Sequence, residues 1–117
     1  MPDIIRLKSN ARSSAIVIHG ATIYLTGQVA ANRDRPIREQ TDETLSKIDA
    51  LLAEAGSDKS RILSAQIWLK DISRDFAEMN EVWDAWTVPG ATPTRATAQC
   101  EMAAPDVLIE IIVTAAI

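Results

Sequence analysis

The last quarter of the chain places the tightest constraint on the fold. Residues 95–102 alternate between polar and small or apolar side chains, and residues 107–113 are apolar apart from Glu110. Alternation is typical of a strand with one covered face, and an apolar run is typical of a strand that is largely buried. The Pro-Asp pair between the two stretches favours a tight turn. We therefore expect an antiparallel hairpin with its turn at residues 103–106.

In this hairpin Glu110 would lie opposite Gln99 and share a sheet face with Arg95 and Thr97. A register slip of two residues would keep that arrangement, whereas a slip of one would reverse it. A carboxylate in an apolar strand usually has a partner. Two interpretations stay open: a cross-strand ion pair that only fixes the sheet, or an anion-binding Arg95 beside a Glu110 that orients water.

The rest of the chain predicts further strands and two helices. Residues 3–12 suit a short edge strand, and the other expected elements are strands at 14–19 and 22–29, a helix opened by Pro36 and closed by Gly56, a strand at 61–69, and a helix ended by Pro89-Gly90. The order β-β-α-β-α-β-β predicts a single α+β domain over residues 1–117, a mixed sheet with two helices on one face. Its other face carries small and apolar residues and is a candidate subunit interface.

Two apolar patterns are interpreted as packing. The strand at 61–69 is apolar enough to be covered on both faces. In the second helix Phe76, Met79, Trp83 and Trp86 recur at spacings of three and four, which we interpret as a core stripe rather than a ligand box.

Composition limits the classes of function. The chain has 117 residues, 47% hydrophobic and 24% charged, and a net charge of −4, so no basic stripe predicts a nucleic-acid partner. A single cysteine gives no internal disulfide and no cysteine-based metal cluster. No apolar run approaches the roughly 20 residues of a membrane span, and the N-terminal residues do not resemble a signal peptide, so we expect a cytoplasmic protein. His19, beside a turn glycine, is interpreted as a surface residue.

Several of these stretches occur together in one known family. The spacing of Arg95 and Glu110, the segment Pro93-Thr94-Arg95, and Leu25-Thr26-Gly27-Gln28 resemble the reactive intermediate deaminase (Rid, or YjgF) family, over about Ser13 to Thr114. The resemblance implies a chorismate-mutase-like fold and homotrimers with ligand clefts between neighbouring subunits. It also implies hydrolysis of 2-imino acids or enamines to 2-keto acids and ammonia, with no cofactor or metal.

The resemblance also assigns roles to residues. Arg95 corresponds to the arginine that holds the substrate carboxylate, and Glu110 to the glutamate that orients or activates water. Asn80 corresponds to an asparagine that could bind the substrate or a neighbouring loop. The Thr26-Gly27 edge is implied to lie at the ligand pocket, and Gly27 within a strand also suggests a bulge or the close approach of another backbone or a ligand.

Two positions depart from the family pattern. Ser13 stands where archetypal members carry a tyrosine, and Thr97 where they carry a cysteine. Thr97 keeps a hydroxyl for substrate binding, and the pocket near Ser13 is expected to be more open. Cys100 does not replace the missing thiol, because it alternates onto the face away from Arg95.

Three functions remain open from the sequence. The first is an imine or enamine deaminase that uses Arg95 and Glu110. The second is a small-carboxylate-binding protein of the same fold without turnover. The third is a protein-interaction module in which the cleft has no role.

Overall fold

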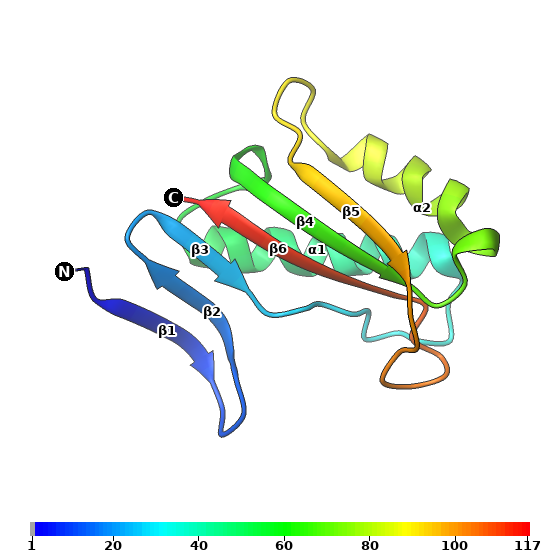
Figure 1. The fold of residues 1–117 in the computed structure, drawn as a ribbon, viewed down its shortest axis with the longest axis horizontal. Helices are drawn as coiled ribbons and strands as arrows, with labels where there is room; N and C mark the ends of the chain where they lie inside the picture. Colours follow the sequence, from blue (N-terminus) through cyan, green and yellow to red (C-terminus); the bar gives the residue numbers. More distant parts are fainter. Residues whose placement is uncertain (1) are drawn as a thin grey trace.

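All strands of the protein form one mixed sheet. The structure is a computed structural model that describes residues 2–117, and it contains β1 (Ile4–Ser9), β2 (Ser14–His19), β3 (Thr22–Leu25), α1 (Ile37–Glu54), a 3₁₀ turn (Lys59–Arg61), β4 (Ile62–Leu69), α2 (Ile72–Trp86), β5 (Thr94–Gln99) and β6 (Ile109–Ala116). The strand order is β1-β2-β3-β6-β4-β5 (Figure 1). This confirms the α+β class, with β1 as the expected edge strand. None of the helices in the described part of the chain is long and apolar enough to cross a membrane.

Helix α1 begins and ends where the sequence predicts. It follows Pro36, whose missing N–H costs nothing in a first turn. At its other end Gly56 has a φ of 84°, a left-handed conformation that favours glycine. The N–H of Gly56 donates to the carbonyl of Ala53 at 3.1 Å, and that of Ser57 donates to Leu52 at 2.8 Å. This Schellman pattern satisfies two of the last helical carbonyls.

The core lies between the helices and one face of the sheet. Strands β4 and β6 both alternate between buried residues on the helix face and more exposed residues on the other, which we call the open face. The predicted coverage of residues 61–69 on both faces is therefore wrong for a single chain. The buried residues of these two strands are Ile62, Ala65, Ile67, Leu69, Ile109, Ile111, Val113 and Ala115.

Helix α2 lies at the β5 end of the sheet (Figure 1). Met79 and Trp83 of its apolar stripe are buried, as predicted. The prediction is wrong for Phe76, whose side chain is 40% exposed. The physical reason is that β5 is the last strand of the sheet, so this part of the stripe has no further strand to cover it.

The predicted hairpin of the last two strands does not form. Strand β4 lies between β5 and β6, and it pairs with β5 in parallel and with β6 antiparallel (Figure 1). Helix α2 is the crossover that makes β4 and β5 parallel. Residues 100–108 carry the chain around the end of β4. They contain a turn at Pro105-Asp106, close to the predicted one, in which the N–H of Val107 donates to the carbonyl of Ala104 at 3.2 Å, but this turn does not join two paired strands.

Candidate functional site

Arg95 lies on the helix face of β5, in register with the buried Ala65. Its guanidinium carbon lies 5.5 Å from the ring centre of Trp83 and 6.0 Å from that of Phe76. Its Nη1 donates to Oδ1 of Asn80 at 2.7 Å. None of the ion pairs among residues 2–117 includes Arg95. The side chain is thus anchored by one hydrogen bond and by aromatic rings while its charge stays available to an anion.

Thr97 follows Arg95 on the same face of β5, in register with Ile67. Its hydroxyl oxygen is buried, and it has no hydrogen-bond partner within the described chain. A buried hydroxyl without a partner carries a desolvation cost. Thr97 therefore adds an unused polar group next to the arginine.

Glu110 lies on the open face of β6, directly opposite Trp68 of β4. Its side chain is half-buried, and this burial raises the pKa of its carboxyl group above the ordinary value. Within residues 2–117 neither an ion pair nor a hydrogen bond compensates for that burial. A carboxylate of this kind is more basic than one in water, as a general base requires.

Gly27 lies beside the Glu110 carboxylate. Tyr24 pairs with Thr114 of β6, whereas Gln28 pairs with Ile111, so the register shifts by one residue and the chain bulges around Gly27. A Cβ atom on Gly27 would overlap the carboxylate oxygen of Glu110. The predicted bulge is present, whereas the group closest to Gly27 is the side chain of Glu110 rather than a backbone or a ligand.

Ser13 and Thr26 are exposed residues at the open end of the β2–β3 hairpin, away from its turn at Gly20. The N–H of Ser13 donates to Oδ1 of Asn10 at 3.0 Å in the turn that follows β1. The N–H of Thr26 donates to the carbonyl of Ala15 at 3.0 Å, so pairing of the two strands continues past Leu25. Ser13 and Thr26 therefore lie towards the same end of the sheet as Gly27.

The structure separates the predicted site residues into two groups. We call Asn80, Arg95 and Thr97 the arginine half-site, and Ser13, Thr26, Gly27 and Glu110 the glutamate half-site. Arg95 and Thr97 are on the helix face of β5, so Ala98, which alternates with them, is on the open face. Trp68 of β4 pairs with Ala98 on one side and with Glu110 on the other, so Glu110 is also on the open face. The predicted shared face is wrong, because inserting β4 between the strands changed the register. An Arg95–Glu110 ion pair within one chain does not exist.

Two aromatic contributions to the site were missed from the sequence. Phe76 and Trp83 were interpreted only as core residues, yet both lie against the guanidinium of Arg95. A signal was present, since Phe76, Asn80 and Trp83 are spaced at i, i+4 and i+7 and so share one face of a helix.

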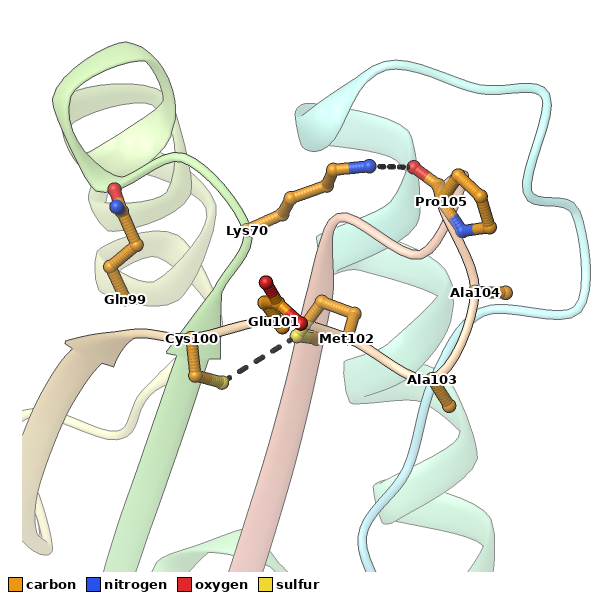
Figure 2. Close-up of a pocket in the computed structure, with 8 residues that line it drawn as sticks. All are labelled: Lys70, Gln99, Cys100, Glu101, Met102, Ala103, Ala104 and Pro105. Carbon is orange, nitrogen blue, oxygen red and sulfur yellow. Dashed lines mark hydrogen bonds between the residues drawn. The ribbon is translucent and has the colours of Figure 1, made fainter.

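One hollow of the surface lies away from both half-sites. It has a volume of about 460 Å³ and lies where β4 and β5 end, between Lys70 and the loop that contains Cys100 (Figure 2). The ammonium group of Lys70 donates to the carbonyl of Pro105, and Sγ of Cys100 is 3.7 Å from Sδ of Met102. No residue of either half-site lines this hollow.

Comparison with known proteins places the chain in a family. A family model described as endoribonuclease L-PSP matches residues 4–117. The chain belongs to this family. Among its relatives, the RutC family protein YoaB of Escherichia coli K12 is 47% identical over 114 residues, covering 97% of this chain and 98% of YoaB. A RutC family protein of Haemophilus influenzae is 42% identical over 111 residues, covering 94% and 95% of the two chains.

Solved structures of the endoribonuclease L-PSP family share the fold closely. NMB1025 of Neisseria meningitidis, a member of the YjgF protein family, has a TM-score of 0.94 at 43% identity and covers 97% of this chain and 94% of its own. A Pseudomonas aeruginosa protein also has a TM-score of 0.94, at 39% identity, with coverage of 97% and 98%. These matches confirm the resemblance to the YjgF family and the fold that it implies.

Proposed function

We propose that the protein hydrolyses 2-imino acids, or their enamine tautomers, to 2-keto acids and ammonia without a cofactor. A water molecule adds to the imine carbon, and the resulting aminoalcohol expels ammonia as the C–N bond breaks and the C=O bond forms. Arg95 would hold the substrate carboxylate through two parallel N–H groups. Glu110 would take a proton from the attacking water and return one to the departing nitrogen.

The observation that carries this proposal is the state of Arg95. A guanidinium that is stacked on aromatic rings, tied to Asn80 and left without a carboxylate partner is prepared for a small anionic ligand. Fixing the side chain in advance reduces the entropy lost when the ligand binds. The raised pKa of Glu110 supports the second role, because a desolvated carboxylate is a stronger base.

The two half-sites would meet between copies of the chain. Because Arg95 and Glu110 lie on opposite faces of one sheet, one subunit cannot bring both to the same small molecule. A homotrimer would solve this by placing the arginine half-site of one subunit against the glutamate half-site of its neighbour, giving three equivalent clefts. The open face, with exposed Tyr24 and Trp68, offers apolar area for such contacts.

An RNA substrate is less consistent with this chain, despite the name of the family model. The protein has 16 acidic against 12 basic residues. Affinity for RNA depends on neutralising several phosphates with a basic surface. The arginine half-site has one such charge, which suits one small carboxylate.

A second candidate function is binding of small carboxylates without turnover. It is favoured by one observation, the arrangement of the arginine half-site entirely within one chain. Such a protein would sense or sequester keto or imino acids and would not need Glu110.

Complementation between two inactive variants tests the proposal. Arg95→Ala removes one half-site and Glu110→Gln the other, and each variant alone is expected to lose most of its activity. When equal amounts of the two variants are unfolded and refolded together, the subunits of each trimer combine at random. About a quarter of the clefts would then contain both an intact Arg95 and an intact Glu110. Activity is measured as the accelerated loss of an imino acid generated in situ by an amino-acid oxidase.

The outcomes separate the alternatives. Recovery of activity in the mixture supports a deaminase with a shared cleft. An active wild type whose mixed variants stay inactive would contradict the shared cleft. If the wild type accelerates no imino acid but binds pyruvate through Arg95, the deaminase is wrong and the binding protein is right. If pyruvate does not bind either, only an interaction module remains.

A further inference from the structure

Phe76 is an exposed aromatic residue of α2, between two side-chain contacts that hold this helix against β5. At the start of α2 the N–H of Ile72 donates to Oε1 of Gln99 at 2.9 Å. Two helical turns later Asn80 accepts from Arg95 at 2.7 Å. Helix α2 and strand β5 therefore run antiparallel, side by side.

The helix segment and the strand segment between these two contacts have nearly the same length. Eight helical residues from Ile72 to Asn80 span about 12 Å. Four strand residues from Gln99 to Arg95 span about 13 Å. Phe76 is midway along the helical segment and Thr97 is midway along the strand, so the turn that carries Phe76 lies over Thr97. This position agrees with the burial of the Thr97 hydroxyl.

The two rings beside Arg95 differ in their access to solvent. Trp83 is 5% exposed and Phe76 is 40% exposed, although both ring centres lie within about 6 Å of the guanidinium carbon. Trp83 can therefore position the arginine but has little surface left for a ligand. Phe76 has a free apolar surface beside the unpaired charge.

We propose that Phe76 forms the apolar wall that receives the side chain of the bound acid, and that the protein prefers imino and keto acids with sizeable apolar side chains. The preference among substrates rests on the proposed deaminase function, whereas the preference among bound acids does not. In such an acid the side chain branches one atom from the carboxylate, so a carboxylate held by Arg95 leaves its side chain within reach of Phe76. Each methylene group placed against such a wall adds up to about fourfold in affinity.

The experiment compares substrates of two sizes on the protein as it assembles in solution. Imino acids made in situ from leucine and from alanine give the ratio of their kcat/KM values, which we expect to favour the leucine-derived substrate by roughly tenfold. In Phe76→Ala this ratio should fall towards one because the larger substrate is processed more slowly. Phe76→Leu keeps an apolar side chain and should retain most of the preference.

Two further variants separate specificity from positioning. Trp83→Phe should change kcat/KM for both substrates by the same factor, because it disturbs Arg95 rather than the wall. Leu63→Ala removes an apolar side chain that is 51% exposed and lies outside both half-sites, so it should leave the ratio unchanged. Alanine is favourable in a helix, so Phe76→Ala should fold, which its melting temperature would show.

A binding measurement keeps the inference independent of catalysis. Calorimetric titration with 4-methyl-2-oxopentanoate and with pyruvate should show tighter binding of the larger acid by the wild type, and a loss of that difference in Phe76→Ala. The inference is overturned if the wild type prefers the smaller acid, or if Phe76→Ala leaves the preference intact or weakens both acids equally. If the protein shows the expected binding preference but hydrolyses no imino acid, the proposed reaction is wrong and the role of Phe76 in binding is supported.

Discussion

Gly27 leaves the space that the carboxylate of Glu110 occupies. A Cβ atom at Gly27 would overlap the carboxylate oxygen, whereas the backbone of Gly27 does not have the positive φ that excludes other residues. Gly27 thus affects Glu110 by leaving room for its carboxylate, and not through a special backbone conformation. A larger residue at this position would push the end of the Glu110 side chain away from the neighbouring strand.

Gly27→Ala should displace Glu110 without unfolding the protein. A shift of about 1 Å in a reacting group can reduce activity on the order of 10²-fold, so we expect a loss of that size in kcat/KM for imino acid hydrolysis. Glu110→Asp, one methylene shorter, should recover part of the loss when combined with Gly27→Ala.

Gly20→Ala is the matched control for that experiment. Gly20 has a φ of 62° with nothing close to its Cβ direction, so alanine there strains the backbone and should lower the melting temperature but not kcat/KM. Equal activity in Gly27→Ala and the wild type would show that Glu110 does not need its present position.

Glu110→Gln should not destabilise the protein at neutral pH. Burial raises the pKa of Glu110 in the folded protein, so folding favours the protonated form. The stability that this group contributes is complete below the unfolded value of about 4.3 and is lost as pH rises through the raised folded pKa. Glutamine resembles the protonated form, so the variant should melt at the same or a higher temperature at pH 7, and the difference should disappear at pH 4.

Thermal unfolding across this pH range checks the prediction, with Glu101→Gln as an exposed control. A variant that melts well below the wild type at pH 7 would mean that the Glu110 carboxylate has a stabilising partner.

Asn80→Asp should weaken binding of carboxylates while leaving the fold intact. The asparagine oxygen accepts a hydrogen bond from Arg95, and an aspartate there would turn that contact into an ion pair and compete with the ligand for the guanidinium. We expect roughly a tenfold rise in Kd for pyruvate, equivalent to one charge-assisted hydrogen bond of about 1.5 kcal/mol. Asn80→Ala, which leaves the charge free, should have a smaller effect in the same titration, and the reverse order would contradict a role of the charge.

Gln40→Leu should destabilise the fold through the segment that leads into β6. The buried Gln40 amide donates to the carbonyls of Arg33, Arg35 and Asp106 at 3.1, 2.9 and 3.0 Å, and its oxygen accepts from the N–H of Leu108 at 3.0 Å. A buried group left without a partner costs about 1–3 kcal/mol, whereas water can reach the carbonyls of the exposed Arg33, Arg35 and Asp106 at a smaller cost. A total loss of about 2–4 kcal/mol in the free energy of unfolding is therefore expected.

Denaturant unfolding measures that loss against an exposed neighbour on the same helix. Glu39→Leu should change the free energy of unfolding by less than about 0.5 kcal/mol. Similar values for the two variants would mean that water replaces the contacts of Gln40.

Local patterns in the sequence determined most of the secondary structure. Pro36 and Gly56 mark the two ends of α1, and Gly20 marks the turn between β2 and β3. The alternation along residues 95–99 correctly predicted that Arg95 and Thr97 share one face of β5. Each of these signals acts within a few residues, where backbone conformation and side-chain alternation dominate.

Only the tertiary structure decided which strands became neighbours. The residues from 94 to 116 suit a hairpin, but the crossover through α2 places β5 against β4 in parallel, and β6 enters between β3 and β4. Strand pairing is a non-local choice that depends on burying both helices and the central strand together, and alternation alone is equally compatible with either partner. For that reason the sequence could only predict Arg95 and Glu110 as site residues, and the fold alone decided that they face opposite sides of the sheet.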